Sequence, residues 1–208
     1  MQAKGQSLWP PLVPVVGSAL GGGYFAGQIS TAGNSIADYN LIVGPVASAE
    51  SILQFKIVNT SDAGATSVIN GPANSASMND VTHPAAQFCE GLTIGGFNDW
   101  YMPAKNELEV CYYNLKPTTT GNNTSSGINA NAVPARASTY TNPSPPAQTT
   151  AAAFITSTGA EAFIVGGYWS STEGSATNAW LQGFGNGGQY NYGKTNTYRV
   201  RAVRRVAV

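Results

Sequence analysis

The alternation of apolar and polar positions predicts β-strands at both ends of the chain. Three early segments, residues 24–29, 39–45 and 52–59, are rich in β-branched and aromatic side chains and are bounded by Gly, Ser and Asn, as strands usually are. The same pattern returns near the C-terminus in residues 161–165, 167–172, 179–184, 188–194 and 198–206. Two of these later segments are joined by "GFGNGGQY", and a Gly/Asn turn of this kind is typical of a β-hairpin.

The middle of the chain carries the helical patterns. Residues 83–92 place Pro84 at the expected first helical position and Gly91 near the end, which are the residues that favour a helix start and a helix stop. Residues 102–117 begin in the same way with Pro103. In this second helix the i, i+3, i+4, i+7 spacing predicts one buried stripe, made of Leu108, Cys111, Tyr112 and Leu115. Off the stripe lie Asn106, Glu107 and Glu109.

Polar, turn-rich segments separate these elements. Residues 60–80 are expected to form a long ordered loop, residues 118–146 a surface excursion, and residues 148–156 a short third helix. Strands first, helices next and strands last indicate an α+β domain with a mixed or antiparallel twisted sheet, two main helices and long loops. In such a domain the first and last strands are expected to pair in one antiparallel sheet.

Composition limits the classes of function. Of the 208 residues only 10% are charged, with ten acids and ten bases, so the formal net charge is zero. No global field therefore favours nucleic acid as a partner. The 42% hydrophobic fraction, together with 24 glycines and 12 prolines, indicates a globular, loop-rich protein with a neutral surface of hydroxyls and amides. No apolar run approaches the length of a membrane span, so no membrane insertion is expected.

Residues 1–23 are predicted to form an N-terminal arm that precedes a single domain of residues 24–208. Pro10, Pro11 and Pro14 interrupt the apolar part of this segment, which disfavours a secretory signal and favours an extended conformation. Three glycines at 21–23 would act as a hinge. We expect the arm to dock the domain onto a particle or a partner chain.

The residues that usually perform catalysis or bind metals are sparse. The one histidine, His83, precedes Pro84 and is interpreted as a helix-capping or loop residue, because no nucleophile motif accompanies it. The acidic residues are scattered singly, so neither a calcium loop nor a carboxylate pair for sugar cleavage is indicated. Cys89 and Cys111 are expected to be two buried free thiols, with a disulfide as the alternative. We therefore expect no enzyme activity, no cofactor and no metal.

Half of the basic residues fall in the last fifteen positions. These are Lys194, Arg199, Arg201, Arg204 and Arg205. One interpretation is a phosphate-binding strip. The favoured alternative is internal pairing with carboxylates such as Glu173 or Glu107, which would lock sheet to helix.

A second C-terminal pattern indicates recognition. Aromatic residues of the last forty positions alternate with amides, and Tyr, Asn, Ser and Gly are the residue set of adaptable binding surfaces. Trp169, Trp180, Val200 and Val203 are interpreted as core, and Arg201 as an internal anchor. The remaining polar rim of the hairpin, residues 178–196, is the predicted binding edge: Asn178, Gln182, Asn186, Gln189, Tyr190, Asn191, Tyr192 and Lys194.

Four motifs resemble the DUF1566 family, also called the Lcl C-terminal domain. They are "DWYMPAKNEL" at 99–108, "YWSST" at 168–172, "AWLQGF" at 179–184 and "VRAVR" at 200–204, and the resemblance extends over residues 84–205. The form present here is similar to versions encoded by tailed bacteriophages, and it implies a C-type-lectin-like fold. The motifs also contain the expected structural anchors: Asp99, Trp100, Pro103, Glu107, Trp169, Glu173, Trp180 and Arg201.

The resemblance implies a non-catalytic receptor-binding or adhesion protein of a phage virion, placed in a tail fibre or tail tip. Its partners would be a host surface glycan or protein, other virion proteins contacted through residues 1–23, and further copies of the chain in a homo-trimer. The calcium-binding sugar motifs "EPN", "QPD" and "WND" of animal lectins are absent. The alternative is a structural virion component, such as a capsid-decorating or tail-assembly protein with no ligand of its own.

Overall fold

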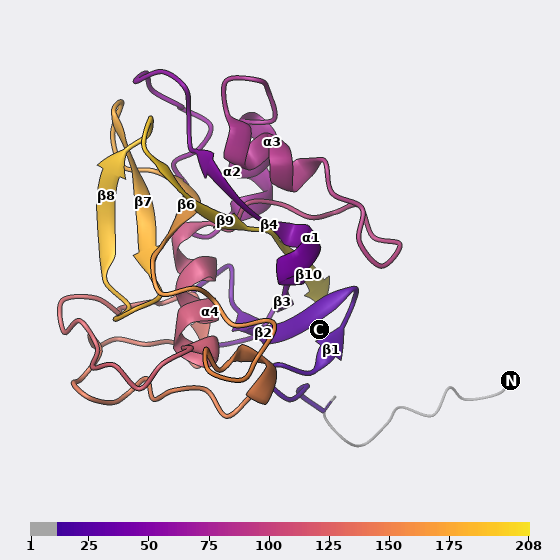
Figure 1. Ribbon diagram of the computed structural model, residues 1–208, viewed down its shortest axis with the longest axis vertical. Helices are drawn as coiled ribbons and strands as arrows, with labels where there is room; N and C mark the ends of the chain where they lie inside the picture. The colour runs from indigo at the N-terminus through magenta and orange to yellow at the C-terminus, as the bar shows by residue number, and fades with distance from the viewer. Residues whose placement is uncertain (1–11) are drawn as a thin grey trace, which may run out of the picture.

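Two five-stranded sheets enclose one long helix in the computed structural model, which describes residues 12–208 (Figure 1). The helix is α4, Lys105–Leu115. The first sheet has the order β1–β2–β3–β10, with β5 paired to β2: β1 Ala19–Leu20, β2 Gly23–Ile29, β3 Tyr39–Val43, β5 Ala132–Val133 and β10 Val203–Ala207. The second has the order β4–β9–β6–β7–β8: β4 Glu50–Gln54, β6 Gly167–Glu173, β7 Asn178–Gly183, β8 Gln189–Gly193 and β9 Thr197–Arg201. The α+β class is confirmed.

The two ends of the chain meet in both sheets. β3 pairs antiparallel with β10 and β4 pairs antiparallel with β9, as the order of elements predicts. The expected single last strand, residues 198–206, is instead two strands separated by Ala202, because the chain passes from one sheet to the other there. Ala202 N–H donates to the Ala49 carbonyl and its own carbonyl accepts from Gly44, both at 2.9 Å. The alternation of faces expected along these residues is therefore broken at Ala202.

The helices differ from expectation in detail. α3, Pro84–Glu90, begins at the predicted proline, but Pro103 lies before the N-cap of α4, Ala104, and so is outside the helix. The predicted loop 60–80 contains α2, Gly71–Ser77. Only a 3₁₀ turn, Ala152–Phe154, forms in the expected third helix, and residues 161–165 are not a strand. A further short helix, α1, is Val46–Ala49.

The buried side chains of helix α4 extend beyond the predicted apolar stripe. Leu108, Cys111, Tyr112 and Leu115 are fully buried as expected, but so are Glu107 and Glu109. Glu107 accepts from the Arg205 Nε at 2.8 Å and from the Ala104 N–H at 2.8 Å. Glu109 accepts from Tyr140 at 2.6 Å, from Asn129 Nδ2 at 2.5 Å, and from Arg136. These contacts satisfy the buried carboxylates, as burial requires.

The partners of Glu109 come from residues 118–146, so this segment packs along α4 and is more than a loose surface excursion. Asn122, Asn129 and Asn131 are nearly inaccessible within it. Asn122 accepts hydrogen bonds from Tyr112 Oη at 2.8 Å and Lys116 Nζ at 2.7 Å. The segment also reaches the hairpin of β7 and β8, because Asn123 N–H donates to the Asn186 carbonyl at 2.7 Å and the Gln189 N–H donates to Ser126 Oγ at 3.0 Å.

Residues of the four sequence motifs contribute to both hydrophobic cores of the domain. Trp100 and Trp169 are buried in one cluster with Met102 and Val200, and Val203 is buried in the other cluster beside Tyr112 and Phe184. Cys89 and Cys111 are free, buried thiols in different clusters, as expected.

The predicted arm ends earlier than residue 23. Residues 1–11 lie outside the described part of the chain. From residue 17 onward the chain belongs to the domain, because Gly17 N–H donates to Phe25 at 2.8 Å and β1 pairs with β2. Ahead of that point Leu12 is 95% exposed and Val15 is 76% exposed.

Substitution of Gly187 should destabilise the fold. Its φ is +76°, and an added Cβ would lie 2.2 Å from the ring of Tyr112. We expect Gly187→Ala to lower the free energy of unfolding by roughly 1–3 kcal/mol, measured by urea denaturation. Gly166→Ala is the matched control, because its Cβ would meet nothing within 4 Å. Equal stability of the two variants would contradict this role for Gly187.

Loss of the Arg201 guanidinium should lower the free energy of unfolding more than the substitution of Gly187 does. Its side chain is 0% exposed, pairs with Glu161 at 2.8 Å and donates to the Gly44 carbonyl at 2.8 Å. Arg201→Met removes the cation from Glu161, which keeps the Val46 N–H at 2.8 Å, and leaves the Gly44 and Glu161 carbonyls without this donor. Breaking such a buried pair costs roughly 3–5 kcal/mol. Arg199→Met is expected to cost less, since that guanidinium is 30% exposed and its partner Glu50 keeps the Tyr168 hydroxyl at 3.0 Å. A larger loss for Arg199→Met in denaturation experiments would refute this ranking.

Candidate functional site

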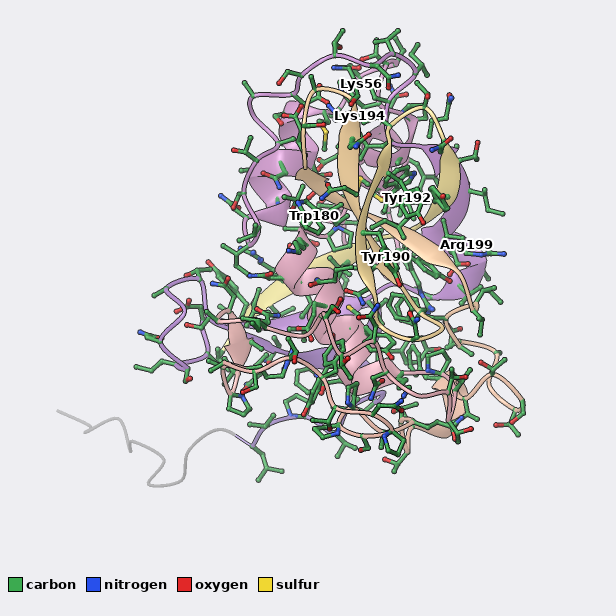
Figure 2. The ribbon with its side chains drawn as sticks, turned by 90° about the vertical axis from the view of Figure 1, so that its left-hand side faces the viewer. Lys56, Trp180, Tyr190, Tyr192, Lys194 and Arg199 are labelled. Atoms are coloured by element: carbon green, nitrogen blue, oxygen red, sulfur yellow. The ribbon has the colours of Figure 1, made fainter. Side chains whose placement is uncertain are left out.

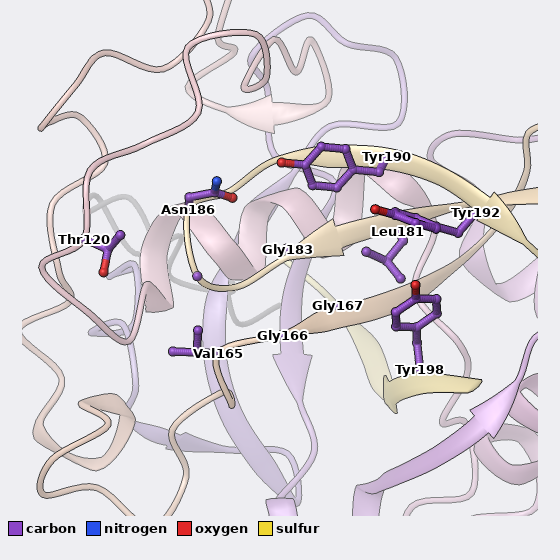
Figure 3. Close-up of a pocket in the computed structure, with 11 residues that line it drawn as sticks. Thr120, Val165, Gly166, Gly167, Leu181, Gly183, Asn186, Tyr190, Tyr192 and Tyr198 are labelled. Atoms are coloured by element: carbon purple, nitrogen blue, oxygen red, sulfur yellow. The ribbon is translucent and has the colours of Figure 1, made fainter. Parts of the chain in front are cut away.

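An open groove of about 410 Å³ crosses the face of the second sheet. Tyrosines from β8 and β9 form one wall, and Val165 and Thr120 lie across from them (Figure 3). We call it the tyrosine groove, and it is lined by Thr120, Val165, Gly166, Gly167, Leu181, Gly183, Gly185, Asn186, Tyr190, Tyr192 and Tyr198. Its volume lies within the roughly 300–1,000 Å³ of ordinary ligand pockets.

Three tyrosines stand in sequence along the wall. The ring centroids of Tyr190 and Tyr192 are 6.1 Å apart, and those of Tyr192 and Tyr198 are 5.4 Å apart. Tyr190 is 37% exposed and Tyr192 is 40% exposed, and both lie along β8 on one side of the molecule (Figure 2). Burial, and then the neighbouring Tyr192, raises the pKa of Tyr198, so its hydroxyl stays protonated at neutral pH and can donate a hydrogen bond.

Glycines form the floor. Gly166, Gly167, Gly183 and Gly185 line the groove from β6, β7 and the turn that follows β7. A Cβ at Gly166 would meet nothing within 4 Å, so a side chain there would project into open space. The lack of side chains along the floor leaves the flanks of the tyrosine rings accessible.

Hydrogen bonds from neighbouring residues fix the β7–β8 hairpin, which carries Tyr190 and Tyr192. Gln182 donates to the Gly187 carbonyl at 2.8 Å and fixes the turn after β7. From residues 118–146, Asn123 N–H donates to the Asn186 carbonyl at 2.7 Å, and Asn123 Nδ2 donates to Tyr190 Oη at 3.2 Å. The groove is therefore built on a constrained turn.

The predicted binding edge divides between two faces of the hairpin. Residues directly opposite in an antiparallel pair share a face, so Leu181 and Ala179 place Tyr190 and Tyr192 on the groove face. The opposite face carries Asn178, Gln182, Gln189 and Asn191 together with Trp180. Asn186 lines the groove from the turn. The groove thus brings together Asn186, Tyr190 and Tyr192 from the eight predicted residues.

Two of the eight are corrected outright, because they are not available to a ligand. Gln182 is 2% exposed and Lys194 is 0% exposed. Gln182 is needed for the turn, as described above. Lys194 was predicted as the last residue of the polar rim, but its side chain turns inward to buried carboxylates.

Sequence analysis missed Tyr198, Thr120, Val165 and the glycines of the groove. Tyr198 lies just outside the predicted binding edge, residues 178–196, although its strand β9 follows β8 after a short turn. Its position beside Tyr192 depends on the strand order β9–β6–β7–β8. The one local signal was the glycine pair 166–167 directly before an aromatic strand, because glycine within a strand often marks close approach of a ligand or backbone.

Comparison with known proteins identifies the family. The family model described as "Lcl C-terminal domain" matches residues 58–204, more than half of the chain. The chain belongs to the Lcl C-terminal domain family. No curated protein matches the chain.

One solved structure resembles this Lcl C-terminal domain weakly. It is a fimbrial protein from Bacteroides ovatus, with 14% sequence identity and a TM-score of 0.46, over 79% of this chain and 35% of that protein. The Lcl C-terminal domain described here thus spans about a third of that protein's length.

Most of the residues that the motifs predicted as structural anchors make contacts inside the domain. Asp99 binds Arg204 through two hydrogen bonds of 2.6 and 2.8 Å. The Trp169 indole donates to the Leu53 carbonyl at 3.2 Å. Trp180 is corrected: it is only partly buried, and its ring lies under the Lys105 ammonium at 3.6 Å. Burial lowers the pKa of that lysine.

The basic C-terminal segment is fully paired, as the favoured interpretation predicted. Its five cations each contact a carboxylate of another segment: Arg199 with Glu50, Arg201 with Glu161, Arg204 with Asp99, Arg205 with Glu107, and Lys194 with both Asp62 and Glu173. Both carboxylates named in the prediction are used, but neither binds Arg201. No unpaired basic strip is left for phosphates in this segment.

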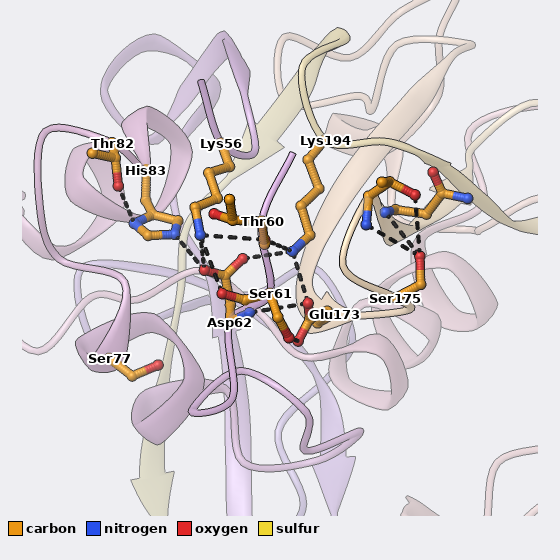
Figure 4. Close-up of polar contacts among 12 residues, drawn as sticks. Lys56, Thr60, Ser61, Asp62, Ser77, Thr82, His83, Glu173, Ser175 and Lys194 are labelled. Carbon is orange, nitrogen blue, oxygen red and sulfur yellow. Dashed lines mark hydrogen bonds and ion pairs between the residues drawn. The ribbon is translucent and has the colours of Figure 1, made fainter. Parts of the chain in front are cut away.

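Lys194 belongs to a buried ionic cluster at the edge of the second sheet (Figure 4). Its ammonium lies 2.7 Å from Asp62 and 2.8 Å from Glu173, and Lys56 pairs with the other oxygen of Asp62. His83 places Nε2 2.9 Å from Asp62 and Nδ1 2.9 Å from Asp80. Each charged side chain of the cluster is paired with another member of the cluster. These pairs connect residues 60–62 to the end of β8, the end of β6 and the start of α3.

Neither metal sites nor membrane spans are evident in the described part of the chain. Within residues 12–208 no three His, Cys, Asp or Glu side chains gather in a way that could hold a metal ion. Over the same residues no helix combines the length and hydrophobicity needed to cross a membrane.

Acid should destabilise the Lcl C-terminal domain through Asp62. Burial raises the pKa of this carboxyl, but hydrogen bonds from Lys194, Lys56 and His83 together outweigh burial, so the pKa lies below its usual value. A carboxyl of lowered pKa adds stability above its unfolded pKa of about 3.9, and this stability is lost as the pH falls through the folded value. The hydrogen bond from Thr82 lowers the pKa of Asp80 to about 2.

We therefore expect the free energy of unfolding to decrease as the pH falls from about 4 towards 2, measured by urea denaturation at successive pH values. Asp62→Asn should flatten this acid dependence. Glu90→Gln is the control, because burial raises the pKa of Glu90 and its removal leaves the acid limb in place. An unchanged slope in Asp62→Asn would show that the cluster does not control acid stability.

Proposed function

We propose that this chain is a receptor-binding or adhesion module of a bacteriophage virion, carried in a tail fibre or tail tip, with a C-type-lectin-like body. The tyrosine groove would be its recognition surface. The observation that carries the proposal is an open groove whose exposed tyrosines stand on a rigid sheet. Rigid aromatic side chains provide contact area at low entropic cost, which is what recognition surfaces require.

The lining of the groove supports binding in preference to catalysis. It offers hydroxyl groups, one amide and apolar surface, without a carboxylate, an imidazole or a thiol among its residues. A hydrolase would need a positioned acid, base or nucleophile at the reacting atoms. We infer that the domain binds its target without changing it.

The arrangement of the chain suits attachment through the N-terminal end. The first described residues include the exposed apolar side chains of Leu12, Val13 and Val15, and the chain enters the domain at the end away from α2 and α3 (Figure 1). The part of the N-terminal segment that precedes residue 17 would contact other virion proteins, with a homo-trimer as the expected assembly. The groove would then face outwards toward the host.

Purified full-length chain should bind cells of the host strain, and truncation of the exposed rings should reduce this binding. We expect the double variant Tyr190→Ala/Tyr192→Ala to weaken cell binding by about tenfold or more, the usual cost of losing central aromatic contacts. Fluorescence cytometry with labelled protein measures the effect. The control is Val81→Ser, which removes an exposed apolar side chain elsewhere (76% exposed).

The outcome separates the proposal from its alternative. Wild-type protein that binds no host cell, while intact particles do, would favour a structural virion component such as a decoration or tail-assembly protein. Binding that survives in the double variant, with an unchanged melting temperature, would move the recognition surface away from the groove. Release of fragments from host capsule would contradict a non-catalytic role.

A further inference from the structure

The tyrosine groove has no charged side chain in its lining. The nearest members of the basic segment are already paired: Arg199 with Glu50 and Lys194 with Asp62 and Glu173. A charged ligand would lose part of its hydration in the groove and would find no opposite charge there. Desolvation of an unpaired charge is strongly unfavourable. Electrostatic complementarity therefore selects an uncharged occupant.

The tyrosine wall selects an occupant with both apolar and hydroxyl surface. The π-face of each ring is electronegative and attracts polarised C–H groups, while its hydroxyl can donate and accept hydrogen bonds at the rim. Along residues 12–208 no other side chain is hydrogen-bonded to the hydroxyls of Tyr192 and Tyr198, and Asn186 uses its Oδ1 to accept from Gly188 at 3.1 Å. Asn186 lines the groove from the turn (Figure 3), and its Nδ2 is left to donate to a ligand.

The floor disfavours an extended polypeptide. Its backbone groups are already paired within the sheet, since Gly167 pairs with Gly183, Leu181 pairs with Tyr190, and the Phe184 N–H donates to the Gly166 carbonyl at 2.8 Å. Peptides that bind sheets gain affinity from main-chain hydrogen bonds at an open edge. The groove lies on a face of the sheet, so it has few such groups to offer and recognises its occupant through side chains.

We propose that the occupant of the tyrosine groove is a neutral saccharide, whose sugar rings lie with their C–H faces on Tyr190, Tyr192 and Tyr198. The equatorial hydroxyl groups at the edges of the rings would hydrogen-bond with Asn186 Nδ2, the tyrosine hydroxyls and Thr120. This inference rests on the proposed function and specifies the ligand class of the same site.

The experiment measures binding of the full-length chain to host envelope fractions in three states: untreated, oxidised with periodate, and digested with proteinase K. Periodate cleaves vicinal diols of sugars, whereas proteinase K removes protein. We expect periodate to reduce binding by about tenfold or more and proteinase K to leave it unchanged. Released envelope glycans are then separated by anion exchange, and the neutral fraction should compete for binding while the acidic fraction should not.

Two variants connect the result to the groove. Gly166→Leu adds a large side chain at a glycine that lines the groove, without a backbone penalty, because the site is open and its φ is not positive. Tyr190→Ala removes an exposed ring from the wall. Both should lose about tenfold in binding to the untreated fraction, with melting temperatures close to the wild type. Ala47→Leu places the same side chain at an exposed position of α1 and should bind normally.

The possible outcomes distinguish a failure of the neutral-saccharide proposal from a failure of the proposed receptor-binding function. Binding that is lost after proteinase K but kept after periodate would overturn the neutral saccharide while leaving a receptor-binding function intact. Competition by the acidic fraction, or normal binding by a folded Gly166→Leu protein, would also overturn it. Absence of binding to every untreated fraction would refute the proposed function itself.

Discussion

The pairing of every C-terminal cation with a carboxylate from elsewhere in the chain is the constraint on which the fold depends. Arg204 and Arg205 hold β10 to Asp99 and Glu107, while Lys194 holds the end of β8. Such pairs are costly to desolvate and costly to break, so they specify one arrangement of the two sheets around α4. Because these cations lie late in the chain, the ion pairs form only when the last strands have packed onto the rest of the domain.

The same pairing accounts for the character of the surface. With few charges in the sequence and the C-terminal cations consumed internally, the second sheet presents a face of glycine, amide and tyrosine. The turn after β7 is fixed by Gln182 beneath it and by the segment around Asn123 beside it. Preorganisation of this kind reduces the entropy lost on binding, so a neutral groove with rigid rings can recognise a ligand without ion pairs.

Most elements could be predicted from the sequence, because local periodicity and turn residues specify them. Glu107 was predicted as an internal partner of the basic segment, and it pairs with Arg205. The predictions failed where tertiary contacts decide the outcome: Glu109 lies off the predicted buried stripe, yet it is fully buried because partners from a distant segment satisfy it. The binding edge was predicted only in part for the same reason. Alternation along β8 separates Tyr190 from Asn191, but which face carries the groove depends on the neighbouring strands.

The most direct test of the account is the footprint of the bound target on the domain. Hydrogen–deuterium exchange of the full chain, with and without host envelope glycan, should show protection confined to the groove, namely residues 164–167, the turn after β7, β8, and the chain around Thr120 and Tyr198. The opposite face of the hairpin, around Trp180, and the ionic cluster around Asp62 should exchange unchanged. Protection centred on either of those regions, with β8 unaffected, would contradict the claim that the tyrosine groove is the recognition site.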